Sequence, residues 1–220
     1  MSPVSCFMGS GTPDARGRAR GNHGWSIWHC LTLMRYGSEI KTARLRLRVL
    51  TSADAPRLAE IGADWDIASM TSRMPYPYSE AAADQWINGI EPNEVVLGIT
   101  YDGELIGVTG YLPETDGRSA EIGYWLGRAY WGRGFATEAA AGLIDYCFRR
   151  ERFSHVTCGH YFDNPASARV IEKLGFTFTG QSECWCEARR TKVAAMRYRL
   201  NRPKPFQRTL AKAIRQLHGS

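Results

Sequence analysis

The stretch from Leu126 to Tyr146, LGRAYWGRGFATEAAAGLIDY, constrains the fold most, because it joins a strand end, a glycine turn and a helix. Gly132, Gly134 and the small Ala136 leave a run of backbone N–H groups with little side-chain bulk, so an anion can approach the first helical turn. The helix is amphipathic, with apolar residues on one face at Ala136, Ala140, Leu143, Ile144, Cys147 and Phe148. The stretch therefore predicts a pyrophosphate-binding loop or a turn whose glycines only allow close packing of strand on helix.

The positive charge of the chain is concentrated at its two ends. Of 220 residues with a formal net charge of +6, the basic excess lies in residues 1–48 and 202–220, so residues 49–201 carry a net negative charge. We therefore expect a basic, disordered N-terminal extension (1–42), one folded domain (43–201) and a basic C-terminal tail (202–220) with apolar residues at near-helical spacing. Nucleic-acid binding is disfavoured and would act only through the tails.

Membrane and metal functions receive no support from the sequence. No apolar stretch is long enough to span a membrane. The six cysteines form no CxxC pair, and no histidine stands at zinc-ligand spacing. Reduced thiols in a cytoplasmic protein are the simplest interpretation, although Cys184 and Cys186 share one strand face, where metal or redox use stays open.

The remaining pattern alternates strands and helices. A strict alternation predicts a strand at 44–49, and the dipeptide Asp102-Gly103 predicts a hairpin between 95–101 and 104–111. A third strand, about 120–126, leads into the glycine turn. Helices are expected near 52–61, 80–90, 135–150 and 165–174, and further strands near 155–160, 176–185 and 193–200. Between the first two helices lies a loop rich in aromatic residues and methionine.

Two motifs resemble those of one protein family. The string W-G-R-G-F-A, from Trp131, is similar to the acetyl-CoA loop of the GNAT N-acetyltransferases, [QR]-x-x-G-x-[GA]: Gly134 and Ala136 match, whereas Trp131 departs from it as in the RimJ/RimL-like branch. The string DNPASARVIEKLGF, from Asp163, resembles the N-x-x-S-x-x-x-x-E-K-L-G-F string of that branch, although Asn164 could also be only a helix cap. The chain is identified as a RimJ/RimL-like (ribosomal-protein N-terminal acetyltransferase-like) GNAT member over roughly residues 43–201.

This resemblance implies an α/β (α+β) GNAT fold, a mixed, mostly antiparallel sheet of about seven strands flanked by about four helices. It also implies acetyl-CoA as cosubstrate and no metal. The pantetheine arm would pair with the backbone of Tyr124, Trp125 and Leu126, and Asn164 and Ser167 would lie near the arm and thioester. The pyrophosphate would be held by the N–H groups of Gly132, Arg133, Gly134, Phe135, Ala136 and Thr137. The aromatic-rich loop would wall the acceptor pocket, with Trp65, Met74, Tyr76 and Tyr78 as its candidates.

The implied reaction is direct attack of a neutral amine on the acetyl thioester. An α-amino group, with a pKa of about 7.7–8.0, is more easily neutral at pH 7 than a lysine, so a protein N-terminal amine is favoured slightly over a small-molecule amine. Glu121 is the candidate base, directly or through water, because strand alternation puts it on the same face as Gly123 and Trp125. The alternative is an ordinary solvent-facing strand glutamate. Ser167 could protonate the departing thiolate or be a local cap.

Two alternatives remain at this point. The domain could be a non-catalytic acyl-CoA-binding regulatory or RNA-associated module that acts through its basic tails. The acceptor could also be the amine of an aminoacyl-tRNA, for which the tails would add affinity. The oligomeric state, monomer or homodimer, is left open by the sequence.

Overall fold

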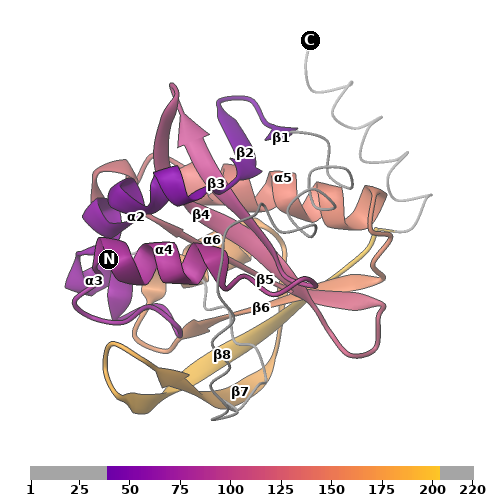
Figure 1. The fold of residues 1–220 in the computed structure, drawn as a ribbon. Coiled ribbons are helices and arrows are strands. Elements are labelled where there is room, and N and C mark those ends of the chain that lie inside the picture. Colours follow the sequence, from indigo (N-terminus) through magenta and orange to yellow (C-terminus); the bar gives the residue numbers. More distant parts are fainter. Residues whose placement is uncertain (1–38, 204–220) are drawn as a thin grey trace.

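One eight-stranded mixed sheet runs through the computed structural model, which describes residues 39–203 (Figure 1). The strands stand in the order β1-β2-β3-β4-β5-β6-β8-β7, and only the β5–β6 pair is parallel. Their bounds are β1 Glu39–Lys41, β2 Leu45–Val49, β3 Val95–Tyr101, β4 Glu104–Pro113, β5 Ser119–Leu126, β6 His155–Tyr161, β7 Thr177–Cys186 and β8 Thr191–Asn201.

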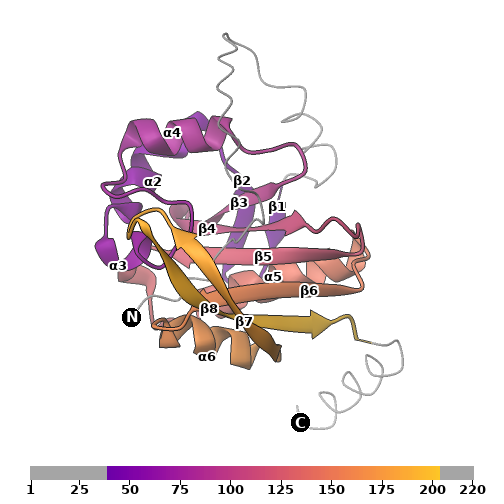
Figure 2. The ribbon, with the colours of Figure 1, turned by 90° about the horizontal axis from the view of Figure 1, so that it is seen from below.

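Helices cover both faces of this sheet (Figures 1 and 2). Five α-helices lie in the described residues: α2 Ala55–Gly62, α3 Trp65–Ala68, α4 Glu80–Asn88, α5 Phe135–Arg149 and α6 Pro165–Lys173. Helices α2 to α4 pack on one face, and α5 and α6 pack on the other. The expected fold class is confirmed, with one strand and one helix more than the sequence indicated: β1 and the short α3.

The start of the sheet corrects the expected domain boundary at residue 43. Strand β1 pairs with β2 from Glu39, inside the segment expected to be an extension. Glu39 forms ion pairs with Lys41 and Arg46. Charged side chains therefore help to hold this edge strand, whose sequence lacks an alternating apolar pattern. The rest of the expected extension and nearly all of the expected C-terminal tail, residues 1–38 and 204–220, lie outside the described residues.

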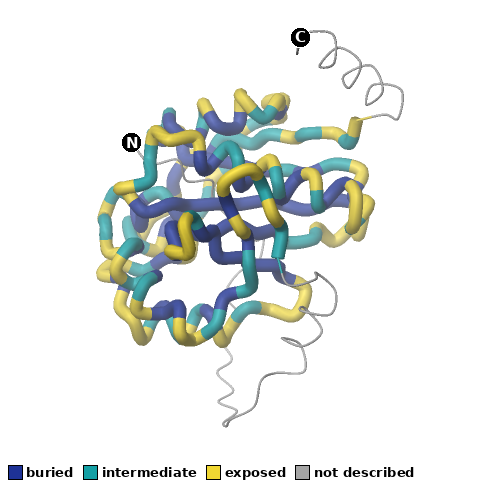
Figure 3. Tube along the Cα trace, turned by 90° about the horizontal axis from the view of Figure 1, so that it is seen from above, coloured by how far each residue is buried: buried dark blue, intermediate teal, exposed yellow. Residues whose placement is uncertain are grey.

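The centre of the sheet is buried on both faces, as Figure 3 shows. Every residue of β5 is buried. Ile122 and Tyr124 contact the core beneath α5, whereas Trp125 belongs to the core beneath α2 and α4. Asp102 and Gly103, at φ 53° and 85°, form the tight turn that pairs β3 with β4, as the sequence predicts.

Strands β5 and β6 separate soon after they meet. Their parallel pairing covers only Ser119–Glu121 against His155–Thr157, while β5 continues to pair with β4 as far as Leu126. Strand β6 continues instead along β8 to Tyr161. The carboxyl half of β5 therefore has no strand partner on its β6 side within residues 39–203, and the sheet opens there, at the end of β5 that leads toward the glycine turn.

Candidate active site

The glycine turn before α5 has a backbone that requires glycine. Gly132 and Gly134 have φ of 74° and 79°, in the left-handed region that other residues rarely adopt. Gly134 is the N-cap of α5, so no side chain from the cap accepts a hydrogen bond from the first helical N–H groups. A Cβ on Gly132 would meet nothing within 4 Å, so the space beside the turn is open. This is the geometry that an anion at a helix N-terminus needs.

Two arginines lie beside this turn. Phe135 has the Arg44 guanidinium 4.5 Å from its ring centre and that of Arg133 4.7 Å from it. Arg44 also binds Glu138 in the first turn of α5 (Nε–Oε2, 2.7 Å) and donates to the carbonyl oxygen of Arg133 (3.2 Å). Burial alone would raise the pKa of Glu138, but hydrogen bonds from Thr42 and Arg44 outweigh it and hold that pKa below its usual range. The β1–β2 turn is thereby fixed to the start of α5.

A hydrogen bond joins β5 to α6 at the second motif. The Tyr124 hydroxyl lies 3.0 Å from Ser167 Oγ, and both residues are buried. Asn164 caps α6 by accepting a hydrogen bond from the Ser167 backbone N–H (3.1 Å), as the sequence predicts for a local cap. Burial raises the pKa of Tyr124 well above its usual value, outweighing the hydrogen bond from Ser167, so the phenol keeps its proton at neutral pH.

Trp131, which departs from the family pattern, has a structural role. Its indole N–H donates to the carbonyl oxygen of Leu126 at 2.7 Å and so ties the glycine turn back to the end of β5. The Arg128 guanidinium lies 5.2 Å from the Trp131 ring centre. Arg128 is itself ion-paired to Asp64 and Asp66 beside α3. The carbonyl of Leu126 is therefore already occupied. The Trp125 carbonyl oxygen lies toward β4, where a Cβ on Gly107 would collide with it, so Tyr124 is the better position for backbone pairing with a ligand on the open side.

Glu121 lies on β5 at the last residue that pairs with β6. It is buried and accepts a hydrogen bond from Arg197 of β8 (Nη1–Oε1, 2.8 Å). Arg197 also binds Ser182 Oγ at 2.9 Å. The expectation of an ordinary solvent-facing glutamate is wrong, because this carboxylate sits inside the sheet face with a guanidinium on it. Arg197 was not anticipated, since nothing in the sequence links positions 121 and 197.

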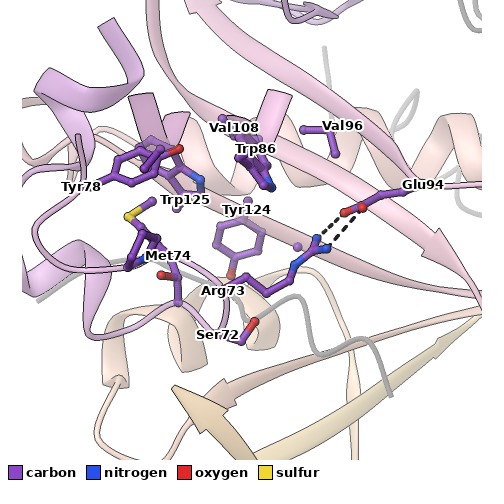
Figure 4. A pocket seen from close by; sticks show the side chains of 14 residues that line it. Ser72, Arg73, Met74, Tyr78, Trp86, Glu94, Val96, Val108, Tyr124 and Trp125 are labelled. Atoms are coloured by element: carbon purple, nitrogen blue, oxygen red, sulfur yellow. Dashed lines mark hydrogen bonds and ion pairs between the residues drawn. The ribbon is translucent and has the colours of Figure 1, made fainter. Parts of the chain in front are cut away.

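A pocket opens on the α4 side of β5 (Figure 4). Gly123, Tyr124 and Trp125 form its β5 wall, and Trp86 of α4 lines it as well. Met74 and Tyr78, two of the four residues expected to wall an acceptor pocket, also line it. The other two, Trp65 and Tyr76, are not among its lining residues. They are exposed and contact each other edge-on, with ring centres 5.1 Å apart.

The tip of the β7–β8 hairpin contacts the segment between α3 and α4, called here the pocket-lining loop. Figure 2 shows this tip beside α3. Arg189, in this tip, donates to the Ser69 carbonyl oxygen and to the Asp163 carboxylate, each at 2.7 Å. Glu187 N–H donates to the Ser72 carbonyl oxygen at 3.0 Å. Arg189 thus joins the pocket-lining loop to the turn before α6, a role that sequence reasoning missed because its partners are far away in the chain.

The glycine turn, the strand opening and the buried tyrosine–serine pair all lie around the carboxyl half of β5, in an α/β protein with a mixed sheet. The GNAT acetyltransferase domain model matches residues 44–177, and the chain belongs to this family. N-acetyltransferase p20 of Bacillus licheniformis, itself uncharacterized, is 32% identical over 147 residues, which cover 63% of this chain and 82% of that protein. The ribosomal-protein-serine acetyltransferase of Escherichia coli K12 is 33% identical over 78 residues, 35% of this chain and 44% of that one.

Solved structures agree with the fold. RimL, described as a ribosomal L7/L12 alpha-N-protein acetyltransferase in complex with coenzyme A, superimposes with a TM-score of 0.65 at 20% identity and covers 74% of this chain and 97% of its own. The sequence similarity to the ribosomal-protein-serine acetyltransferase of Escherichia coli agrees with the RimJ/RimL-like branch that the two motifs indicate. No helix in residues 39–203 is long and apolar enough to cross a membrane.

Proposed function

We propose that the protein is an acetyl-CoA-dependent N-acetyltransferase that acetylates a primary amine. One observation carries the proposal: the opening between β5 and β6 adjoins a helix N-terminus whose glycine turn leaves backbone N–H groups accessible. A ligand with an extended arm and a pyrophosphate fits these two features together. RimL, which has the same fold, is known in complex with coenzyme A.

In this proposal each part of the ligand has its own set of residues. The N–H groups from Gly132 to Thr137 hold the pyrophosphate, with Arg133 adding positive potential at the turn. No salt bridge within residues 39–203 neutralises Arg133, whereas Arg44 is paired with Glu138. The backbone of Tyr124, which faces the open side of β5, pairs with the pantetheine arm in place of the missing strand.

The chemistry needs two proton transfers. A neutral amine attacks the thioester carbonyl carbon, the C–N bond forms, the C–S bond breaks, and coenzyme A leaves as a thiolate. Glu121 takes the proton that the nitrogen loses, directly or through a water molecule. The thiolate receives a proton from the Ser167 hydroxyl, which takes one in turn from the Tyr124 phenol through their hydrogen bond. Glu121 then releases its proton to solvent and the phenol regains one from solvent, so every group returns to its starting state. Arg197 holds the Glu121 carboxylate in place on β5 through their ion pair.

The acceptor is a protein N-terminal amine or a small-molecule amine. The name of the Escherichia coli relative and the description of RimL both refer to ribosomal proteins, which supports a protein acceptor. The lower pKa of an α-amino group supports the same choice, because less free energy is needed to remove its proton.

The decisive experiment measures thiol release from acetyl-CoA with a panel of peptides, polyamines, amino-acid amides and antibiotics, together with calorimetric titration of coenzyme A. Turnover with at least one amine and saturable binding are expected. Binding without turnover of any amine would leave a non-catalytic acyl-CoA-binding module instead. The absence of binding would exclude both.

A further inference from the structure

The pocket on the α4 side of β5 has mostly apolar walls. Six large side chains line it: Met74, Tyr78, Trp86, Val96, Val108 and Trp125. They come from the loop after α3, from α4 and from the strands β3, β4 and β5, so the shape of the pocket is set by the core of the domain. Tyr78 is buried deeply enough that its pKa is raised well above the usual value by burial, so its phenol is uncharged.

The charges at this pocket are already paired with each other. Arg73 donates to both carboxylate oxygens of Glu94, one of them at 3.3 Å, and Figure 4 shows the pair at one side of the pocket. The Glu94 side chain is 3% exposed and that of Arg73 is 47% exposed. Separating such a pair leaves a buried carboxylate without its partner, which is strongly unfavourable. A charged group entering the pocket would have to compete with this ion pair.

The pocket meets the proposed reaction centre at β5. Its lining includes Gly123, Tyr124 and Trp125, the residues that follow Glu121 at the opening of the sheet. The Tyr124 side chain connects the pocket to Ser167 through its hydroxyl. A group bound in the pocket would therefore place its amine at the β5 wall, on the strand that carries Glu121 and beside the Tyr124 side chain.

We propose that the acceptor amine carries an apolar side chain of leucine or phenylalanine size, which binds between Trp86, Met74 and Trp125. This rests on the proposed acetyltransferase function and specifies its acceptor: an α-amine beside a large apolar group, and neither a polyamine nor an amine beside an acidic group. Arg73 and Glu94 stay paired with each other, so a charged side chain in the pocket would lose its hydration without gaining an ion-pair partner. The pocket therefore disfavours charged side chains.

Amino-acid amides test the proposal, because they share one α-amine and differ only in the side chain. We expect kcat/KM for leucinamide and phenylalaninamide to exceed that for glycinamide by about tenfold or more, the scale of burying such a side chain. Lysinamide and the 1-amide of glutamate should not exceed glycinamide. A preference for either charged amide, or leucinamide within about twofold of glycinamide, would overturn the proposal.

Two variants of α4 provide a matched pair. Ala82 lines the pocket and is half-buried, whereas its neighbour Ala81 is exposed and outside it. Ala82→Phe should fill the pocket and bring the leucinamide-to-glycinamide ratio toward one, while Ala81→Phe should leave the ratio unchanged. Equal ratios in the two variants would show that the apolar side chain binds elsewhere.

A binding measurement separates this proposal from the proposed activity. Leucinamide and glycinamide are titrated into the full-length protein with coenzyme A present, in the two variants and in the parent. Selective binding of leucinamide that Ala82→Phe removes supports the pocket even if no amide is acetylated. If amides are acetylated but bind without this selectivity, the activity stands and the apolar acceptor is refuted.

Discussion

Gly134 and Gly175 offer a controlled test of the proposed pyrophosphate loop, because both have φ of 79° and both lie at a helix end. A Cβ at Gly134 would approach only the Arg44 guanidinium, at 3.7 Å, and one at Gly175 would meet nothing within 4 Å. Valine at either position is therefore destabilised by backbone strain and hardly by collision. The strain is on the order of 2 kcal/mol in both variants.

The two variants should lose stability alike and differ in ligand binding. A strain of this size lowers the Tm by roughly 4–8 °C in a domain of this length, measured by thermal unfolding. Calorimetric titration should show coenzyme A binding to Gly134→Val about tenfold to a hundredfold more weakly, the scale of one hydrogen bond to a charged group. Gly175→Val should bind as the parent does, since its strain lies beyond the C-terminus of α6.

Parent-like coenzyme A affinity in both valine variants would refute the assignment. The glycines before α5 would then serve only the packing of strand on helix, the other interpretation that the sequence allows. A loss of affinity in both variants would instead indicate that strain anywhere in the domain weakens binding.

Three further predictions concern proton transfer and pH. Glu121→Gln should lower kcat by about a hundredfold with coenzyme A affinity unchanged, and the residual rate should keep rising with pH until the acceptor's own pKa is passed. Tyr124→Phe, which leaves Ser167 Oγ without its hydroxyl partner, should lower kcat by about tenfold in the same thiol-release assay. The pKa of Glu138 is lowered in the fold, so its pairing with Arg44 contributes stability that is present above the unfolded pKa of about 4.3 and lost as pH falls through the folded value.

Each of these has a control. Glu172, exposed on α6, gives the charge-matched variant Glu172→Gln, which should leave kcat unchanged. If Glu121→Gln stays within a few fold of the parent, proton removal belongs to water or to another group. An unchanged kcat in Tyr124→Phe would exclude the phenol from assisting Ser167 in protonating the thiolate. For Glu138, the test is acid unfolding: Glu138→Gln should flatten the fall in unfolding free energy below about pH 4, and a parallel shift would contradict the reasoning.

Local patterns in the sequence were sufficient for the elements around the site. The Gly132 and Gly134 conformations, the Asn164 cap and the Asp102-Gly103 turn are each decided by a few neighbouring residues, and the structure has all of them. The face of Glu121 follows from strand alternation in the same way. The roles of these residues in binding and catalysis stay predictions, because a local sequence pattern determines the conformation of the chain and not its contacts with a ligand.

The contacts between distant residues could not be predicted. Glu121 and Arg197 are 76 positions apart, and Arg189 and Ser69 are 120 apart, so neither pairing leaves a periodic signal. The family resemblance, applied to this loop rich in aromatic residues, predicts Trp65 and Tyr76 beside Met74 in the wall of the acceptor pocket. In an irregular segment, however, composition does not fix which side chain turns inward, and these two contact each other at the surface.

The short parallel contact between β5 and β6 gives the two parts of the sheet, β1–β5 and β6–β8, little backbone hydrogen bonding to each other. Only three residue pairs join them along the backbone, so a ligand paired with β5 would complete a ladder that the chain leaves unfinished. Folding and binding are then thermodynamically linked. At a ligand concentration a hundred times its Kd, the occupied protein is more stable than the empty one by about 2.7 kcal/mol. The cellular supply of the cosubstrate would thus help to set how long the protein survives unfolding and proteolysis.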